Sequence, residues 1–218
     1  MAVEAAVECR TQHFPILLYH HVREYKNLTE KAAQDISVSP EEFEKQMSYL
    51  ARAWYTSITS KDIEGNSVPC KSIIITLDDG YDNVYTDAFP ILKNMWFTAV
   101  IALIVARMDE HGYLSGKQIR TLQDAGWEIA SHTWDHSFLT QIQKTQLAFQ
   151  IKDSKKYLEQ WFGEKIGIFV YPGWFYGPES LKIVENSWYS YAFNTHFWEA
   201  NLVDHPLELK RIEILPGT

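Results

Sequence analysis

The sequence predicts an α/β fold: a single-domain, distorted (β/α)7 barrel with parallel strands. Short apolar segments alternate with helical segments along the 218 residues, and this alternation is typical of parallel sheets. Most of the apolar segments are continuous rather than alternating in polarity, as in strands that are covered on both faces. Seven such strands in a chain of this length favour a closed or nearly closed barrel.

Seven segments have the length and composition of strands. They are rich in Val, Ile, Leu or aromatic residues over five to nine positions. We expect strands at 14–20, 72–77, 97–105, 127–131, 166–171, 190–194 and 211–215.

Helix signals fall between these strands. Two helices are expected to begin with a capping box, in which an N-cap serine and a side chain three residues later bond to each other's backbone N–H: Ser39 with Glu42, and Ser115 with Gln118. Gly126 is expected to end the second of them. Further helices are expected over about 140–162, stopping at Gly163, and from Pro178 onward.

Composition and charge exclude some classes of protein. The net charge of −8 and the lack of a basic cluster argue against a nucleic-acid partner. The longest apolar run, at 96–106, is too short to cross a membrane, and no signal peptide is visible at the start. Residues 1–13 are expected to be an N-terminal extension. Cys9 and Cys70 allow one disulfide or none.

Two adjacent acids, Asp78 and Asp79, follow the strand at 72–77 directly. Neighbouring carboxylates repel each other, and burial makes the repulsion worse. Gly80 permits a sharp turn after them. An ordinary Asp-Gly surface turn would also explain the pattern. If the two acids are buried instead, a positive charge must lie close by.

A pair of histidines follows the strand at 127–131. His132 and His136 are four positions apart, so a helical turn would bring both rings to one face, about 6 Å apart at Cβ. That spacing suits two ligands of one divalent metal ion. Two histidines with ordinary structural roles are the alternative interpretation.

His20 ends the first predicted strand and His21 follows it, and alternation along a strand turns one inward and the other outward. In parallel barrels the chemistry lies at the carboxyl ends of the strands. A divalent cation held by Asp79, His132 and His136 would supply the missing positive charge beside Asp78. Two histidines and one carboxylate leave coordination positions open, which is the catalytic pattern. The remaining Asp and His would then form an acid–base pair.

These motifs resemble those of the polysaccharide deacetylases with a NodB homology domain, carbohydrate esterase family 4. The first motif of that family is similar to TLDDG at 76–80, and the second to SHTWDH at 131–136. A further motif, LxH, usually lies near the C-terminus in that family, and here it matches LYH at 18–20, near the N-terminus. This order is similar to the circularly permuted branch that contains the IcaB and PgaB deacetylases of poly-β-1,6-N-acetylglucosamine. The deacetylase domain would span 14–218.

The resemblance implies a role for each matching residue. Asp78 corresponds to the general base and His20 to the general acid. Asp79, His132 and His136 correspond to the ligands of one divalent metal ion, with Zn²⁺ expected and Co²⁺ or Ni²⁺ as alternatives.

The third motif of the family is matched in part by FVYPGWFYG at 169–177. Tyr171 and Pro172 agree with the family, and a backbone N–H near Gly173 is the expected oxyanion donor. Val170 stands where many members have Arg, so we hypothesise that Arg211, from the last strand, braces Asp78 instead. Trp134, Trp174, Phe175 and Tyr176 flank these motifs and either stack on sugar rings or cap the barrel core. His13, His111, His196 and His205 are interpreted as surface residues.

The function implied by the resemblance is metal-dependent hydrolysis of the acetamide of N-acetylglucosamine residues. The expected substrate is poly-β-1,6-N-acetylglucosamine or a related acetylated polymer. Peptidoglycan, chitin oligomers and O-acetyl xylan are alternatives within the same chemistry. A carbohydrate-binding member with weak catalysis is a further alternative. The family also implies a location outside the cytoplasm or at the cell surface.

Overall fold

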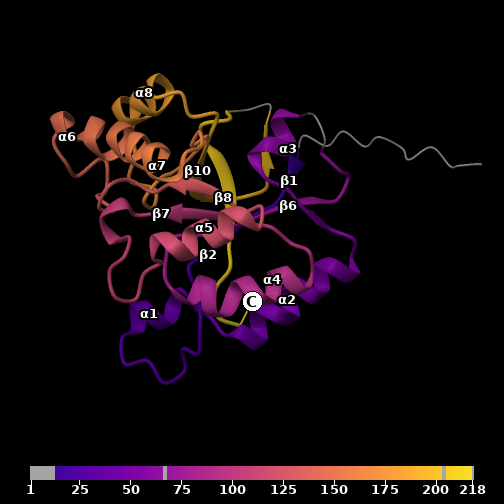
Figure 1. Ribbon diagram of the computed structural model, residues 1–218. Coiled ribbons are helices and arrows are strands. Elements are labelled where there is room, and N and C mark those ends of the chain that lie inside the picture. Colours follow the sequence, from indigo (N-terminus) through magenta and orange to yellow (C-terminus); the bar gives the residue numbers. More distant parts are fainter. Residues whose placement is uncertain (1–12, 66–67, 203–204, 218) are drawn as a thin grey trace, which may run out of the picture.

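A computed structural model describes residues 13–65, 68–202 and 205–217. Seven parallel strands form a closed barrel, because β6 (Ser72–Leu77) pairs with both β7 and β2 (Figure 1). The other strands follow in the order β7 (Val100–Leu103), β8 (Glu128–Ser131), β9 (Ile168–Val170), β10 (Tyr191–Phe197), β12 (Leu209–Glu213) and β2 (Ile16–Tyr19). The predicted (β/α)7 barrel is confirmed.

The closure of the barrel joins the two ends of the chain. Strand β2, the first of the barrel, lies between the last strand, β12, and β6, with Leu17 opposite both Ile212 and Ile75. Each barrel strand falls on one of the seven predicted segments, and most are a few residues shorter. Strand β10 runs three residues past its predicted end, and its register against β12 shifts between Phe193 and Phe197.

Short strands decorate the barrel. β1 (His13–Phe14) pairs antiparallel with β11 (Ala200–Asn201), so His13, which was assigned to the extension, is part of a strand. β3 (His21–Val22) pairs with β4 (Ser37–Val38), and β5 (Thr56–Ser57) adds to the edge of β6. Cys9 and residues 1–12 lie outside the described residues.

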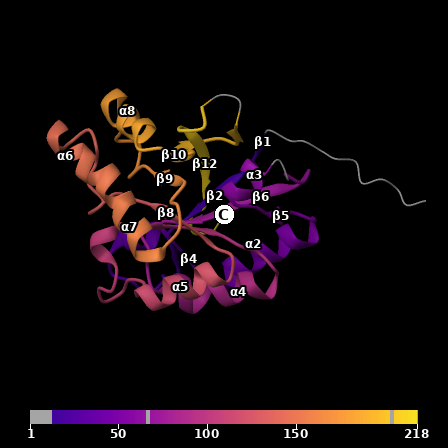
Figure 2. The same cartoon turned by 45° about the horizontal axis from the view of Figure 1, so that its top comes forward.

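The helices pack around the outside of the strands (Figure 2). Four lie where the sequence predicts them: α2 (Pro40–Arg52), α5 (Gly116–Asp124), α7 (Ser154–Phe162) and α8 (Pro178–Asn186). Both predicted capping boxes form. The segment expected to be one helix over 140–162 is α6 (Lys144–Ala148), a π-helical turn (Phe149–Asp153) and α7. The other helices are α1 (Lys31–Asp35), α3 (Ser60–Glu64) and α4 (Phe89–Asn94). A π-helical turn (Val84–Ala88) precedes α4, and a 3₁₀ turn spans Val105–Arg107.

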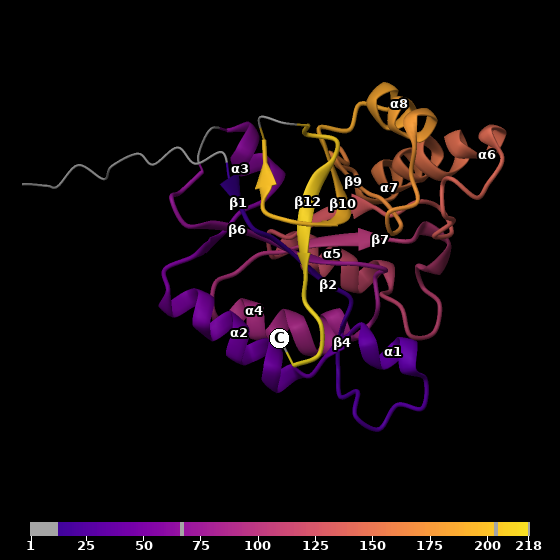
Figure 3. The ribbon, with the colours of Figure 1, turned by 180° about the vertical axis from the view of Figure 1, so that it is seen from behind.

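One part of the barrel wall is not covered by a helix. Among the described residues, the connection from β10 to β12 contains β11 but no helix. Seen from behind, β12 lies in front with no helix over it (Figure 3). No helix in the described ranges is long and apolar enough to cross a bilayer.

The alternation of side chains along the strands separates two cores. Ile74 of β6 and Ala130 of β8 belong to the smaller cluster, inside the barrel, while Ile75 and Ile129 belong to the layer between the strands and the helices. Leu209 of β12 also belongs to the inner cluster. The inward positions continue toward the carboxyl-end mouth of the barrel with Thr76 and Asp78 after Ile74, His132 after Ala130 and Arg211 after Leu209.

Several helices end in the same way before the next strand begins. Trp54, Trp96 and Trp188 follow their helices with φ of 63°, 61° and 61°, in the left-handed region. Gly126 takes the same conformation after α5. The residue after each of Trp54, Trp96 and Gly126 donates its N–H back to the helix, as in a Schellman motif. The three Trp side chains are 83%, 93% and 82% exposed, so no packing within the described chain explains them.

Candidate active site

A buried ion pair lies at the mouth of the barrel. Asp78 directly follows β6, is 2% exposed, and accepts two hydrogen bonds of 2.8 Å from Nη1 and Nη2 of Arg211. The same guanidinium also donates to Thr76 Oγ1 at 3.0 Å and to the carbonyl oxygen of Asn194 at 2.9 Å. This bidentate contact supplies the positive charge that the adjacent acids require.

The charge of Arg211 decides the protonation state of Asp78. Burial by itself would raise the pKa of this carboxyl, but the guanidinium charge and its hydrogen bonds outweigh burial and lower the pKa below its usual value. Asp78 is therefore ionised at neutral pH although it is almost completely buried.

A second cluster lies beside this pair. Asp79 Oδ1 is 3.4 Å from Nε2 of His132 and 3.5 Å from Nε2 of His136, and one ligand atom of each residue lies within 4.8 Å of the others. Asp79 Oδ1 is buried and has no hydrogen-bond partner among the described residues. A divalent cation would coordinate this oxygen and both nitrogens at about 2.0–2.2 Å, so the donor set fits one.

The orientation of His132 supports that fit. Its Nδ1 lies 2.8 Å from the carbonyl oxygen of Val170, which can only accept, so Nδ1 carries a proton and Nε2 faces Asp79. Burial opposes a charge on His132, but Asp79 and Asp78 raise its pKa overall. Burial and the neighbouring His132 lower the pKa of His136 to about 4, so this ring is neutral at neutral pH.

The loop that carries both imidazoles is not helical, so the helical turn considered for His132 and His136 does not form. Instead Thr133 and His136 each adopt φ of 67°, and Thr133 Oγ1 accepts a 2.9 Å hydrogen bond from the backbone N–H of His136. The ring centroids still come within 4.8 Å. Left-handed residues in a tight loop thus achieve what a helical turn was expected to do.

Gln150 holds this loop in place, and the sequence analysis did not identify it. Its side chain is buried in the π-helical turn Phe149–Asp153, and its Oε1 accepts from the backbone N–H groups of Trp134 and Asp135 at 3.0 and 3.3 Å. Single π-helical turns often occur at functional sites. The only available signal was a polar residue at a buried position of the 140–162 pattern.

The turn after Asp78 is also left-handed. Asp79 and Gly80 have φ of 72° and 79°. The positive φ of Gly80 favours glycine, and a Cβ there would lie 3.0 Å from Leu103 Cδ2, so the leucine side chain would have to shift slightly. Burial would raise the pKa of Asp79, but His132 and the other nearby imidazoles lower it overall.

The two neighbouring histidines separate as alternation predicts. His20 directly follows β2, is partly exposed, and lies close enough to Asp78, Asp79 and His136 to influence their pKa values. His21 is buried, lies 2.9 Å from Asn83 Nδ2 through its Nδ1, and stacks on Tyr81 at 3.6 Å. Burial lowers the pKa of His21 to about 3. His20 is therefore the histidine nearer to the chemistry.

The segment after β9 passes close to the mouth. Tyr171 is buried, donates to the carbonyl oxygen of Leu207 at 3.1 Å and stacks on Tyr176 at 4.1 Å. Pro172 is buried, and Gly173 follows at φ of 60°.

The aromatic side chains near the motifs divide into two groups. The ring of Trp134 packs on Phe149 at 4.6 Å, in the helical layer. Phe138, which the sequence analysis did not single out, is 6.0 Å from the ring of His136 and 4.5 Å from that of Phe175. Trp174, beside Phe175, is 66% exposed. Phe138 and Phe175 thus form an aromatic edge beside the metal-type cluster.

Comparison with known proteins identifies the family of the chain. Residues 65–192, more than half of the chain, match the family model for polysaccharide deacetylase. The chain belongs to the polysaccharide deacetylase family. The matched range contains Asp78, Asp79, His132 and His136, whereas His20 and Arg211 lie outside it.

Individual relatives extend the similarity over almost the whole chain. YxkH of Bacillus subtilis (strain 168) is 30% identical over 93% of this chain and 72% of its own length. A poly-beta-1,6-N-acetyl-D-glucosamine N-deacetylase of Staphylococcus aureus (strain MRSA252) is 27% identical, with 82% of this chain and 70% of that protein covered. The solved structure of Streptococcus pyogenes deacetylase PplD in complex with acetate has a TM-score of 0.87 at 26% identity, covering 94% of this chain and 93% of that one.

Proposed function

We propose that this protein is a metal-dependent de-N-acetylase that hydrolyses the acetamide of N-acetylglucosamine residues, with a β-1,6-linked polymer as the first candidate substrate. The observation that carries the proposal is the buried Asp79 oxygen, which lies between two imidazoles and beside the Asp78–Arg211 pair. The name of the Staphylococcus aureus relative supports the linkage.

Asp79, His132 and His136 would hold the metal ion. A bound divalent ion polarises the amide carbonyl and lowers the pKa of water from 15.7 towards about 7. Zn²⁺ is the first candidate, and Co²⁺ and Ni²⁺ are alternatives, because affinity order and supply decide occupancy.

The protein's own groups would move the protons. Asp78, ionised and fixed by Arg211, accepts the proton of the attacking water while the water oxygen bonds to the carbonyl carbon. A backbone N–H near Gly173 stabilises the oxyanion of the tetrahedral intermediate, a contribution of about 3 kcal/mol for one such donor. Tyr171 and Pro172 would shape this turn.

His20 would complete the reaction. In its protonated form it donates a proton to the amide nitrogen as the C–N bond breaks, a contribution of roughly 10²–10⁴ in rate. Acetate and a free amine on the sugar are the products. Trp134, by contrast, would support the loop of His132 and His136 from the helical layer more than it would contact sugar, because its ring packs on Phe149 and Tyr157.

The proposal is tested by acetate release from β-1,6- and β-1,4-linked N-acetylglucosamine oligomers, with metal content measured on the same protein. We expect turnover of the β-1,6 oligomer that a chelator abolishes and Zn²⁺ restores. Asp78→Asn and His20→Ala should each lose turnover while keeping the metal, and Asp135→Asn, an exposed acid in the same loop, is the control. Full activity of His20→Ala would refute its role as the acid.

Other outcomes of this assay identify the alternatives. Preference for β-1,4 oligomers would point to chitin or peptidoglycan, and release only from O-acetyl xylan would point to an esterase. Binding without release on every substrate would identify a carbohydrate-binding member. A polymer substrate of the cell surface would place the enzyme outside the cytoplasm, which fractionation of the source cells would test.

A further inference from the structure

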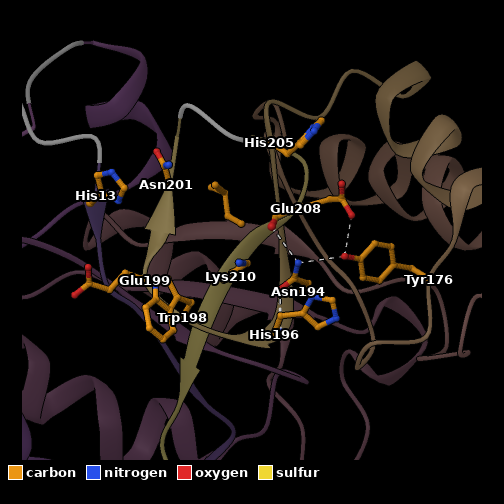
Figure 4. A pocket seen from close by; sticks show the side chains of 11 residues that line it. His13, Tyr176, Asn194, His196, Trp198, Glu199, Asn201, His205, Glu208 and Lys210 are labelled. Atoms are coloured by element: carbon orange, nitrogen blue, oxygen red, sulfur yellow. Dashed lines mark hydrogen bonds between the residues drawn. The ribbon is translucent and has the colours of Figure 1, made fainter.

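A cavity of about 420 Å³ lies at the part of the barrel wall that no helix covers. The loop after β9, strands β10 and β12, and the connection between those strands line it (Figure 4). Asn194 and His196 of β10 alternate with the inward Phe193, and Lys210 alternates with the inward Leu209. The cavity therefore lies mainly on the outer face of these strands, although Leu209 also lines it, and it shares no lining residue with the metal-type cluster.

The back of the cavity is a fixed hydrogen-bond network. Tyr176 donates from its hydroxyl to Glu208 Oε1 at 3.0 Å. Asn194, 1% exposed, donates from Nδ2 to the hydroxyl of Tyr176 at 3.2 Å and to the carbonyl oxygen of Glu208 at 3.0 Å. Asn194 Oδ1 accepts from the backbone N–H of His196 at 3.0 Å. Because these bonds tie three segments together, the cavity is preformed (Figure 4).

The open side of the cavity combines an aromatic face with polar groups. The indole of Trp198 is 64% exposed and lines the cavity together with Glu199, His196 and Lys210. Trp rings provide flat apolar surface with a polar N–H, which suits a ligand with both CH faces and hydroxyl groups. Acidic and basic side chains are both present, so the cavity has no strong preference for an anion or a cation.

We propose that this cavity is an accessory saccharide-binding site that holds N-acetylhexosamine units of the polymer acted on at the barrel mouth. The inference rests on the proposed function for the identity of the sugar. The volume lies within the range of about 300–1,000 Å³ typical of small-ligand sites. Trp198 stacks on a sugar ring, and Glu199, His196 and Lys210 bond to its hydroxyl and acetamide groups.

The position of the cavity connects it to the mouth. Tyr176 forms one wall and stacks on Tyr171 at 4.1 Å, at the start of the loop that begins beside the catalytic groups. Asn194 also links the cavity to the mouth. Its backbone carbonyl oxygen accepts a hydrogen bond from Nε of Arg211, and Arg211 in turn holds Asp78. A long chain engaged at both places is held by two contacts, so its apparent affinity exceeds that of a short oligomer.

Kinetics on substrates of two lengths test this inference. For Trp198→Ala we expect KM for long β-1,6-linked N-acetylglucosamine polymer to rise about five- to tenfold, from the loss of one stacking contact. The kcat, and the kcat/KM for the disaccharide, should not change. The matched control is Trp188→Ala, which removes another exposed indole that does not line the cavity.

Direct binding separates a failure of this inference from a failure of the proposed function. The metal-free protein is titrated with a β-1,6-linked N-acetylglucosamine pentasaccharide, and the indole N–H signal of Trp198 is assigned by its absence in Trp198→Ala. A saturable shift of that signal supports the site even if no substrate is turned over. No shift, together with an unchanged KM for the polymer where turnover is measurable, would overturn it.

Discussion

At the scale of single residues, the site is governed by how a buried carboxylate is kept ionised. Asp78 and Arg211 are both almost fully buried and joined by two hydrogen bonds. Removing one member of such a pair leaves an uncompensated charge in the interior. The proposed catalytic role of Asp78 and the stability of the barrel mouth therefore depend on the same guanidinium.

Replacement of Arg211 tests this dependence. Arg211→Met should destabilise the fold by about 3–5 kcal/mol and abolish turnover. The double variant Arg211→Met/Asp78→Asn removes both charges and should recover much of the lost stability, but none of the activity. Urea unfolding and acetate release measure the two effects separately. An active Arg211→Met enzyme with an unchanged pH profile would refute the proposed bracing role.

The pH dependence of stability follows from the same contact. The folded-state pKa of Asp78 is lowered, so its stabilisation is fully present above the unfolded pKa of about 3.9 and is lost as the pH falls through the folded value. In Arg211→Met/Asp78→Asn this part of the acid-induced loss of stability should be missing.

Gln150 is a second residue on which the geometry of the site depends. It holds the loop that carries His132 and His136 by accepting hydrogen bonds from two backbone amides of that loop. Gln150→Ala should weaken Zn²⁺ affinity at least about tenfold, as loss of outer support does in metal sites. Gln150→Glu keeps the accepting oxygen and should recover part of that affinity. Competition with a chelating dye measures the Zn²⁺ affinity of each variant without any turnover. Gln160→Ala, an exposed glutamine in α7, is the control, and equal affinity in both Ala variants would contradict this role.

At the scale of elements, three turns between a helix and a strand hold a tryptophan in a backbone conformation that costs free energy. Trp54, Trp96 and Trp188 adopt the left-handed conformation, which costs a non-glycine residue about 1–2 kcal/mol. Their exposed rings regain little of this cost within the described chain.

Each Trp→Gly replacement at these three turns should therefore stabilise the protein, by about 0.5–1 kcal/mol after the extra chain entropy of glycine is subtracted. Thermal unfolding of the three single variants measures the change. Trp174→Gly is the control, because Trp174 is exposed without a positive φ and should give no gain. A loss of stability in all three variants would show that the indoles have packing partners.

The elements also show what sequence reasoning can and cannot reach. The seven strands were predictable because continuous apolar runs record burial on both faces. Helix α4 was not predicted, because it continues from a π-helical turn and its N-cap, Ala88, offers no capping side chain. The loop of His132 and His136 was expected to be helical if the pair was to meet, since positive φ at Thr133 leaves no signal in residue type.

Some residues of the site could also be found from the sequence, and others could not. Asp78 and His132 were found from sequence because each follows an apolar strand directly. Arg211 was proposed because Val170 stands where many members of the family have Arg, and the structure shows the contact of Arg211 with Asp78. Gln150 and Phe138 could not be identified, because their partners are set by the packing of helices rather than by any local pattern.

At the scale of the whole molecule, a metal ion that binds only the folded barrel would stabilise all of it. At a free Zn²⁺ concentration of 100 times Kd, the gain should be about 2.7 kcal/mol. Melting with and without a chelator measures it. Asp79→Ala and His132→Ala should lose this gain, whereas His111→Ala, an exposed imidazole elsewhere, should keep it. A metal-induced gain that survives in His132→Ala would place the ion at another site.

The barrel closes only when its first and last strands meet, and this has a consequence during synthesis. Arg211 follows Asp78 by 133 positions, on the strand that seals the wall beside β2. A nascent chain that has emerged no further than β10 has no guanidinium to neutralise Asp78 and no closed wall around it. Asp78 therefore reaches its buried, charge-paired state only after β12 has been synthesised and has paired beside β2.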